Sequence, residues 1–533
     1  MINALILSDN KDFKATLKEK LTNYHTLISK YEHKEISFLT VDLTEFAQVN
    51  FKRWKSAKEH IVDFLFEKLK TFLPFIKSQE RGSIIVLLPD SENIFLSIAV
   101  SAAEGMLKSI ACILIEDDEI KKIEKSIQPT ADENVIDCTD LLLTPGFVNA
   151  HLHSDENMFK GKYDNMPLEL WMLYSYPPTA EYGNFSERLV YLRTMIGAIE
   201  QIKSGVTCCQ DDVSGHPRTT AEGHNIIFKA YKDLGMRANI STSALHKNFL
   251  DTIPYLRDFM PSDFQKEFAN PLPPEEELKE AEQIIKNWNG KDNFKVTLSP
   301  IAPQRCDDDY NIKVFELAEK YDLPYHTHIC ETRMQRETGF EFYRKTILQH
   351  CKDIGILSRR TTIAHGNWLD DRDVEVMAET GATVVHNIVS NLKLGSGIMP
   401  FAKLKEAGVN IALGTDGTSS NDSQNIMEVM KVAALIHKAT QPNYKKWPTS
   451  AQILDAATRS GAQSVMREKE IGSLEVGKKA DILWYYYLPN GLQQWAFVYL
   501  IFGLFVPILF SVILNKICHI AQKYIVKFCY KNN

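Results

Sequence analysis

The stretch that decides the fold is Leu142–His153, LLTPGFVNAHLH, in which apolar residues lead directly into two histidines. His151 and His153 are two positions apart, and the side chains of a strand alternate between its faces. If the stretch is a strand, both imidazoles therefore point to the same side. Two imidazoles on one face can share a metal ion. Either histidine could instead be an ordinary core residue, so the metal-site interpretation depends on the other motifs of the chain.

Seven further runs of β-branched and small residues follow, and most have a helical stretch behind them. The eight runs are Leu142–His153, Gly205–Val213, Arg237–Ala244, Lys295–Pro303, Pro324–Cys330, Thr361–Asn367, Thr383–Ser390 and Asn410–Gly417. The helical stretches include Ser186–Ser204, Glu275–Trp288, Asn311–Tyr321, Leu369–Thr380 and Ser423–Thr440. Such repeats predict an α/β protein of the (β/α)8 TIM-barrel type, with its chemistry at the carboxy ends of the strands.

Polar residues gather where several of these runs end. The motifs YHTHICET, TTIAHG and ALGTDG place there His326, His328, Glu331, His365 and Asp416. Any single histidine has a structural explanation as a hydrogen-bonded core or loop residue. The coincidence of all these groups at strand ends is much harder to explain in that way. The pattern therefore predicts a metal-dependent site at the mouth of the barrel.

On these motifs the chain resembles the amidohydrolase superfamily. More narrowly, it resembles cytosine- and guanine-deaminase-like enzymes, S-adenosylhomocysteine deaminase and the s-triazine hydrolases. The resemblance covers about 112–481 and is carried by PGFVNAHLH, HTHICET, TIAHG, HNIVSNLKLGSG and LGTDGTSSND. It implies a metal-dependent hydrolase, and first of all an aminohydrolase (deaminase). Such an enzyme uses zinc-activated water on a C–N bond of a nitrogen heterocycle or amidine-like substrate.

The resemblance also assigns roles by position. The implied metal ligands are His151, His153, His328 and Asp416. The implied catalytic residues are Glu331, His365 and Asp416. Three imidazoles and a carboxylate suit one zinc ion per chain, with iron as the other candidate, and bound water then ionises near about pH 7. Glu331 would carry a proton to the leaving nitrogen, Asp416 would accept one from water, and His365 would stabilise the attacked oxygen.

Three residues are expected to contact the substrate, although each has a structural alternative. Trp171 follows the first run and could stack on a heterocycle or belong to the core. His246 ends the third run and could line the pocket. Gln304 follows the fourth run, where several relatives carry a histidine and this chain has Ile301. His326 is expected to lie deeper than the ligands.

The expected barrel, 142–471, is flanked by other segments. Residues 1–105 resemble a degenerate short-chain dehydrogenase fragment that lacks the glycine-rich turn, and predict a Rossmann-like α/β appendage with a parallel sheet. Residues 106–141 and 472–488 predict a small β-element, left incomplete because an apolar stretch replaces further strands. That stretch, 495–514, is long enough for a transmembrane helix. It could also be a packed helix or the product of an altered reading frame.

Composition limits the partners and the location. The net charge of −7 gives no basic excess for nucleic acid, so a small-molecule substrate is expected. Nine cysteines without a CxxC pair, and an amino terminus without a signal-peptide pattern, predict a cytoplasmic protein. Membrane association through 495–514 and, from the resemblance, a homo-oligomer are further expectations. Two alternatives remain open: hydrolysis of another leaving group (chloride, an alkylamine or a cyclic amide), and a catalytically inactive scaffold.

Overall fold

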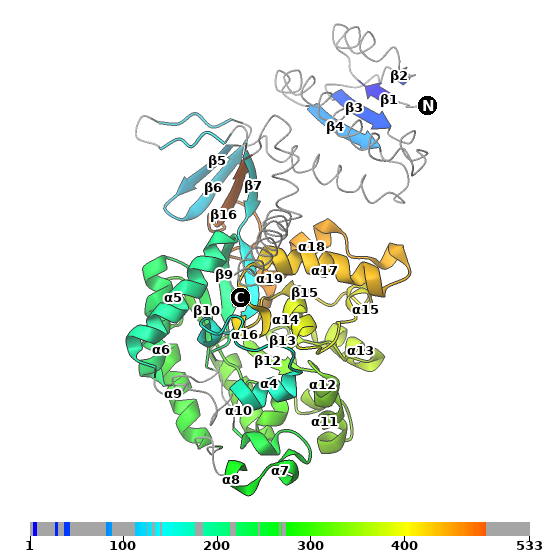
Figure 1. Cartoon of the computed structure of the whole chain (residues 1–533). Coiled ribbons are helices and arrows are strands. Elements are labelled where there is room, and N and C mark those ends of the chain that lie inside the picture. Colours follow the sequence, from blue (N-terminus) through cyan, green and yellow to red (C-terminus); the bar gives the residue numbers. More distant parts are fainter. Residues whose placement is uncertain are drawn as a thin grey trace, which may run out of the picture. The chain divides into compact units, whose positions relative to one another are not determined.

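The structure is a computed structural model (Figure 1). Within residues 1–111 it describes four strands alone. From 112 to 486 it describes every residue except 125, 131–133, 139–140, 176–184, 214–219, 243–245, 266–267 and 269–272. The chain divides into two compact units. One is Met1–Ala111 with Asn134–Leu142, and the other is Cys112–Glu133 with Leu143–Asn533.

Eight parallel strands form a barrel in the second unit. They are β8 (Phe147–Leu152), β9 (Val206–Asp211), β10 (Arg237–Ser241), β11 (Phe294–Thr297), β12 (Tyr325–Ile329), β13 (Thr361–His365), β14 (Thr383–His386) and β15 (Ile411–Leu413). β8 to β11 and β12 to β15 each make a parallel sheet in sequence order. A parallel bridge from Leu298 to Tyr325 joins the sheets on one side, and the Asp416 N–H donates to the His151 carbonyl oxygen on the other. The predicted (β/α)8 barrel is confirmed.

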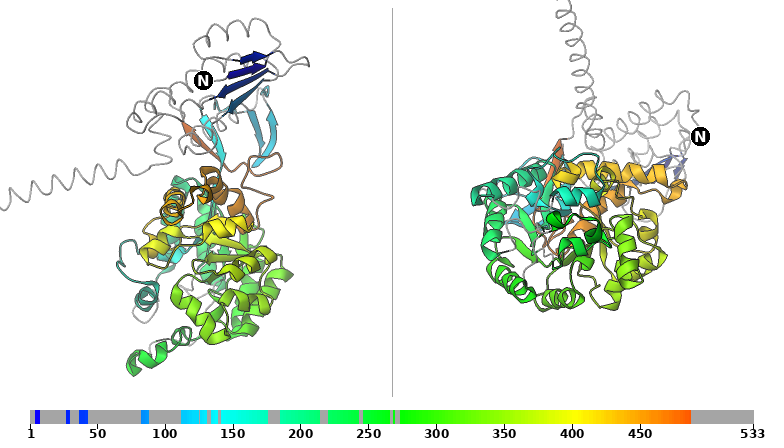
Figure 2. Two further views of the ribbon diagram at one scale, coloured as in Figure 1. Left: turned by 90° about the vertical axis from the view of Figure 1, so that its right-hand side faces the viewer. Right: turned by 60° about the horizontal axis from the view of Figure 1, so that its bottom comes forward.

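Helices surround the strands (Figure 2). They are α4 (Leu168–Ser175), α5 (Glu187–Lys203), α6 (Ala221–Leu234), α7 (Leu256–Phe259), α8 (Ser262–Gln265), α9 (Pro274–Trp288), α10 (Asp308–Lys320), α11 (Arg333–Tyr343), α12 (Ile347–Asp353), α13 (Asp371–Thr380), α14 (Ile388–Lys393), α15 (Phe401–Glu406), α16 (Thr418–Asn421), α17 (Ile426–Thr440), α18 (Ser450–Ala457) and α19 (Arg459–Ser464). Local sequence sets their ends. The Thr220 side chain caps the start of α6, and Gly235, at φ +72°, ends it.

Apolar side chains pack together at the end of the barrel where the strands begin. A buried cluster joins the starts of β8 and β9 to α19 and the turn after it, and consists of Val148, Cys208, Ala462, Val465 and Ile471. These strand residues lie near the amino ends of their strands. The side chains with chemical function lie at the opposite, carboxy ends.

Short strands form the small β-element. β5 (Cys112–Glu116) and β6 (Glu119–Glu124) make an antiparallel hairpin, while β7 (Leu141–Pro145) pairs with β16 (Ile482–Tyr486). The Ile120 N–H donates to the Lys478 carbonyl oxygen at 2.8 Å, which links the hairpin to the segment before β16. An ion pair of 3.1 Å between Arg237 and Asp481 ties this segment to the barrel.

The first unit contains a four-stranded sheet. Its strands are β1 (Ala4–Leu7), β2 (Leu27–Ser29), β3 (Ser37–Asp42) and β4 (Gly82–Leu87), in the order β2-β1-β3-β4. β1 and β3 pair antiparallel, whereas the other two pairs are parallel. The sheet is therefore mixed and differs from the wholly parallel layer that the alternation of strands and helices predicted.

The expectation of a transmembrane helix is corrected. In the described part of the chain, none of the helices combines the length and the apolar character needed to cross a bilayer. The longest of them there, α5, has 17 residues and carries charged side chains such as Arg193 and Lys203. At 1.5 Å per residue it spans about 25 Å, less than the roughly 30 Å of a hydrocarbon core. The apolar stretch 495–514 lies outside the described residues.

The stability of the folded protein depends on pH through the Glu277 carboxyl on α9. Burial raises the pKa of its carboxyl from 4.5 to about 7, and a hydrogen bond with Tyr310 opposes the shift. The folded state therefore holds this proton more tightly than the unfolded chain does, and stability is lost as the pH rises from 4.5 through 7. We expect Glu277→Gln to raise the Tm at pH 8 by about 2 °C or more and to change it little at pH 4. Equal shifts in thermal unfolding at both pH values would contradict this assignment.

Candidate active site

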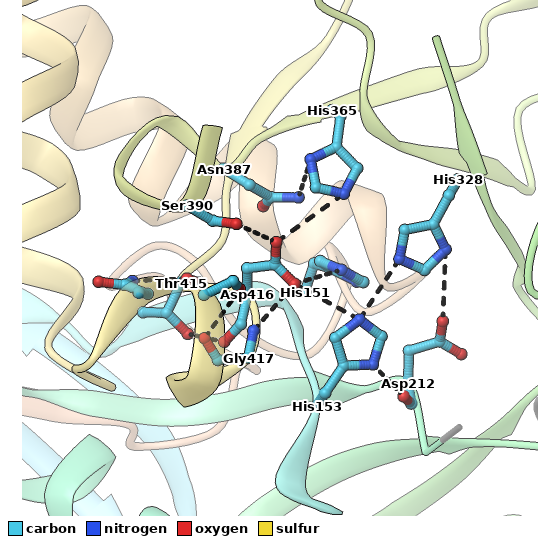
Figure 3. A network of polar contacts seen from close by, with 12 residues as sticks. His151, His153, Asp212, His328, His365, Asn387, Ser390, Thr415, Asp416 and Gly417 are labelled. Atoms are coloured by element: carbon cyan, nitrogen blue, oxygen red, sulfur yellow. Dashed lines mark hydrogen bonds and ion pairs between the residues drawn. The ribbon is translucent and has the colours of Figure 1, made fainter. Parts of the chain in front are cut away.

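Three histidines and an aspartate from β8, β12 and the end of β15 face a common point (Figure 3). Nε2 of His153 lies 3.3 Å from Nε2 of His328. Oδ1 of Asp416 lies 3.3 Å from Nε2 of His151 and 3.4 Å from Nε2 of His153. All four side chains are buried or nearly so. The structure thus brings together the four residues that the resemblance implied as metal ligands.

The donor atoms fit a divalent metal ion. The His153 Nδ1–H donates to the Asp212 carbonyl oxygen at 2.5 Å, and the His328 Nδ1–H donates to the Ile301 carbonyl oxygen at 2.6 Å. Because a carbonyl only accepts, both rings carry a proton on Nδ1 and direct Nε2 toward the common point. The buried Nε2 of His151 has no hydrogen-bond partner among the described residues. Three imidazole nitrogens and a carboxylate oxygen are a donor set that suits zinc.

Nearby carboxylates make this point attractive to a cation. Burial by itself lowers the pKa of His153. Glu156, Asp416, Asp212 and Asp155 outweigh that effect and raise the pKa to about 10. The surroundings therefore stabilise a positive charge at this position, whether a proton or a metal ion carries it.

Local backbone conformation fixes the carboxylate and its neighbours. Cys330, His365 and Asp416, all at strand ends, have φ values of +54°, +76° and +65°. Such left-handed conformations are unfavourable for residues other than glycine by about 1–3 kcal/mol each, and they cluster at functional sites. Two hydrogen bonds hold the Asp416 carboxylate: the Ser390 hydroxyl donates to Oδ2 at 2.6 Å, and the Gly417 N–H donates to Oδ1 at 2.9 Å.

Glu331 and His365 form a second pair beside these ligands. Oε2 of Glu331 lies 3.6 Å from Nε2 of His365, and that nitrogen lies 3.9 Å from Oδ2 of Asp416. The His365 Nδ1–H donates to Asn391, which donates to Asn367, which in turn donates to the Glu331 carbonyl oxygen. One chain of hydrogen bonds therefore positions both residues. Burial raises the pKa of the Glu331 carboxyl to about 6, a value suited to proton transfer near neutral pH.

His326 lies behind the ligands. Its Nε2 is 2.9 Å from Nδ1 of His151, and both rings are fully buried. When Nδ1 of His151 donates across this contact, its Nε2 is left free to face Asp416. His326 thus contacts the side of the His151 ring that faces away from Asp416.

Trp171 belongs to an apolar cluster at the carboxy ends of the strands. It lies on α4, is 8% exposed, and its ring is 6.4 Å from that of Tyr163 in an edge-to-face arrangement. Met172 of the same cluster accepts a hydrogen bond through its sulfur from Arg305. The packing explains why Trp171 is buried, and its contact with substrate stays a prediction.

His246 and Gln304 also lie outside the group of ligand side chains. His246 stacks on Tyr310 with ring centroids 5.0 Å apart, and its Nδ1 lies 3.4 Å from Oδ2 of Asp307. Gln304 is buried in a short helical turn, Pro303–Arg305, and its Oε1 has no hydrogen-bond partner among the described residues. That unpartnered oxygen is available to a ligand, but a role in substrate binding stays a prediction for both residues.

Sequence analysis missed Asp212. This residue follows β9, is completely buried, and is grouped by its position with His151, His153 and His328 as a potential metal-binding set. Burial raises the pKa of its carboxyl, against the opposing effects of His153 and of nearby hydroxyls. The signal was present in VTCCQDDV, where two adjacent acidic residues end the second run.

Comparisons with known proteins agree with this site. Residues 142–499 match the model of the Amidohydrolase family, and the chain belongs to this family. A 5-methylthioadenosine/S-adenosylhomocysteine deaminase of Caldanaerobacter subterraneus subsp. tengcongensis is 34% identical over 374 residues, which are 70% of this chain and 79% of that protein. A 5'-deoxyadenosine deaminase of Methanosarcina mazei is 33% identical over 374 residues, 70% of this chain and 78% of that protein.

Solved structures share the fold. A zinc-bound adenosine deaminase from Xanthomonas campestris gives a TM-score of 0.62 at 26% identity and covers 74% of this chain and 84% of its own. A zinc complex of atrazine chlorohydrolase from Arthrobacter aurescens TC1 gives a TM-score of 0.66 at 23% identity and covers 74% of this chain and 86% of its own. At this identity the likeness shows the fold alone. The chain is a zinc-dependent aminohydrolase that hydrolyses a carbon–nitrogen bond of a small molecule. The predicted family, enzyme class and metal are confirmed.

Proposed function

We propose that the chain deaminates the adenine ring of an adenosine whose 5' substituent is altered. The names of its relatives support this substrate class, because both deaminases described above act on such nucleosides. The observation that carries the proposal is the convergence of His151, His153, His328 and Asp416 on one point, with Glu331 beside them. In the reaction, water replaces the exocyclic amine, and the products are the hydroxylated ring and ammonia.

The proposed zinc ligands are Nε2 of each of the three imidazoles, together with Oδ1 of Asp416. His326 and the Asp212 carbonyl oxygen accept the Nδ1 protons of His151 and His153, so that Nε2 of each ring can bind zinc. Zinc, when bound, lowers the pKa of water toward about 7, which supplies hydroxide at neutral pH. Iron is the other metal that such a set could hold.

Three side chains divide the proton transfers. Asp416 accepts a proton from the attacking water, since it faces the same point as the imidazoles. Glu331 delivers a proton to the ring, takes up the proton of the added hydroxyl group and passes it to the departing amine, and its raised pKa of about 6 suits these transfers. The proton held by Asp416 then returns Glu331 to its starting state. His365, with Nε2 within 4 Å of both carboxylates, holds the attacked oxygen in place.

Ammonia release from a panel of compounds tests the proposal. The panel is 5'-methylthioadenosine, S-adenosylhomocysteine, 5'-deoxyadenosine and adenosine, with guanine and atrazine as compounds of other classes. We expect zinc-loaded protein to deaminate at least one of the four adenosines with a kcat/KM of about 10⁴ M⁻¹s⁻¹ or more. Release of chloride or an alkylamine without ammonia would favour the alternative leaving groups. A protein that holds no metal would favour the inactive scaffold.

We also propose that the chain forms a homo-oligomer. Its support is an apolar stripe on the outer face of α5, which consists of Leu192, Ile196, Ile199 and Ile202 and is between 37% and 53% exposed at each residue. Residues at this spacing lie on one face of a helix, and contiguous exposed apolar surface is typical of protein interfaces. Light scattering should give the mass of at least two chains, and a monomer at working concentration would contradict this.

A further inference from the structure

Asp212 lies behind two of the proposed zinc ligands, on the side of their rings away from Asp416 (Figure 3). Its backbone carbonyl oxygen accepts the hydrogen bond from Nδ1 of His153 at 2.5 Å. Its side-chain Oδ2 lies 3.8 Å from Nδ1 of His328. A single residue therefore contacts the Nδ1 edges of two imidazoles whose Nε2 atoms are only 3.3 Å apart.

The Asp212 side chain is fixed at this place by its neighbours. The Ser241 hydroxyl donates to Oδ1 at 2.6 Å, and the Asp212 N–H donates to the Leu152 carbonyl oxygen at 2.8 Å. Oδ2 is fully buried and forms no hydrogen bond of ordinary geometry with the described residues, although His153 and the hydroxyls of Ser241 and Ser299 act to lower the pKa of this carboxyl. Burial of a carboxylate is unfavourable, so a fully buried Asp212 at this position is explained better by the histidines beside it than by packing.

We propose that Asp212 is a positioning residue for the zinc site. The carbonyl oxygen keeps the proton of His153 on Nδ1, and the carboxylate adds to the Ile301 carbonyl oxygen in favouring a proton on Nδ1 of His328. Both rings then present Nε2 to zinc. The carboxylate also stabilises the positive charge that an imidazole gains when it binds a cation, as outer carboxylates do in other metal sites. This inference rests on the proposed ligand assignment.

Asp212→Asn tests the role of the carboxylate, because it keeps the shape of the side chain and the backbone carbonyl but removes the charge. Zinc affinity is measured by competition with a chelator of known affinity, and the Tm is measured with and without zinc. We expect zinc binding to weaken about 10–100-fold. The Tm of the metal-free protein should change little, because the cost of burying the carboxylate and its attraction to His153 oppose each other. The visible absorption of the Co²⁺-loaded protein should change as well.

Two further variants keep the test decisive. Asp373→Asn removes a buried carboxylate from the cap of α13 and should lower the Tm while leaving zinc affinity unchanged. Ser241→Ala removes the hydrogen bond to Oδ1 and should weaken zinc binding in the same direction as Asp212→Asn, but less.

The outcomes separate this inference from the proposed function. If wild-type protein binds zinc and Asp212→Asn lowers the metal-free Tm with zinc affinity changed less than about threefold, Asp212 is a structural residue and the inference is overturned. If wild-type protein binds no zinc, the ligand assignment fails and the inference fails with it. Loss of zinc affinity in Asp212→Asn without loss of metal-free stability supports the inference.

Discussion

Glu331→Gln should lower kcat by about 10²–10⁴-fold while the protein still binds one zinc per chain. The amide matches the carboxyl in shape but neither gains nor releases a proton at neutral pH. Glu331 lies 3.6 Å from His365 Nε2 and does not belong to either group of potential metal-binding side chains. Proton delivery should therefore be lost while the metal site remains. Steady-state kinetics and metal analysis of the same preparation measure the two effects separately.

Ser396→Ala is the matched control for this substitution. The Ser396 hydroxyl donates to Oε1 of Glu331 at 3.4 Å, so its removal disturbs the same carboxyl without removing it. A reduction in kcat of less than about tenfold is expected for a single long hydrogen bond. Full activity in Glu331→Gln would refute the proton-transfer role. Loss of zinc from that variant would instead make Glu331 part of the metal site.

His328→Ala should abolish zinc binding at micromolar concentrations, and turnover with it. The substitution removes one of the three imidazoles, whose Nε2 lies 3.3 Å from Nε2 of His153. Loss of a direct ligand should weaken binding by more than the 10–100-fold typical of residues that only support a ligand. Zinc content after gel filtration, together with the chelator competition, gives the measurement.

His246→Ala controls for the loss of any histidine from the barrel. His246 stacks on Tyr310 and lies outside the group of potential ligand atoms in the described residues. It should retain one zinc per chain whatever its effect on substrate affinity. If His246→Ala and His328→Ala lost zinc equally, the ligand assignment would be wrong.

The barrel could be predicted because each strand is a short run of β-branched or small residues with a helix behind it. The expected and observed boundaries differ where a strand leads directly into a helix. Thr383–Ser390 was expected as one run, yet β14 ends at His386 and α14 begins at Ile388. The helical turn lets Ser390 donate to Asp416, a contact between distant parts of the chain that no local pattern specifies.

The candidate site could be predicted in part. His151, His153 and His328 stand in recognisable motifs at strand ends, and the structure places their rings together. The acidic pair at the end of β9 marks Asp212 only weakly, because its proposed role depends on how the end of β9 meets side chains from β8 and β12. The substrate residues depend on loops, whose conformation periodicity does not determine.

The flanking segments were the hardest to predict. The mixed pairing of β1, β2 and β3 differs from the parallel layer expected, because alternation of strands and helices does not fix strand direction. The transmembrane interpretation rested on apolar composition alone, and no helix in the described residues supports it.

A crystal structure of the zinc-loaded protein tests the central claim most directly. We predict one zinc per chain, within about 2.0–2.2 Å of Nε2 of His151, His153 and His328 and of Oδ1 of Asp416. Glu331 should lie near the metal without binding it. A zinc ion bound elsewhere, or one that binds the side chain of Asp212 in place of Asp416, would contradict both the ligand assignment and the mechanism built on it.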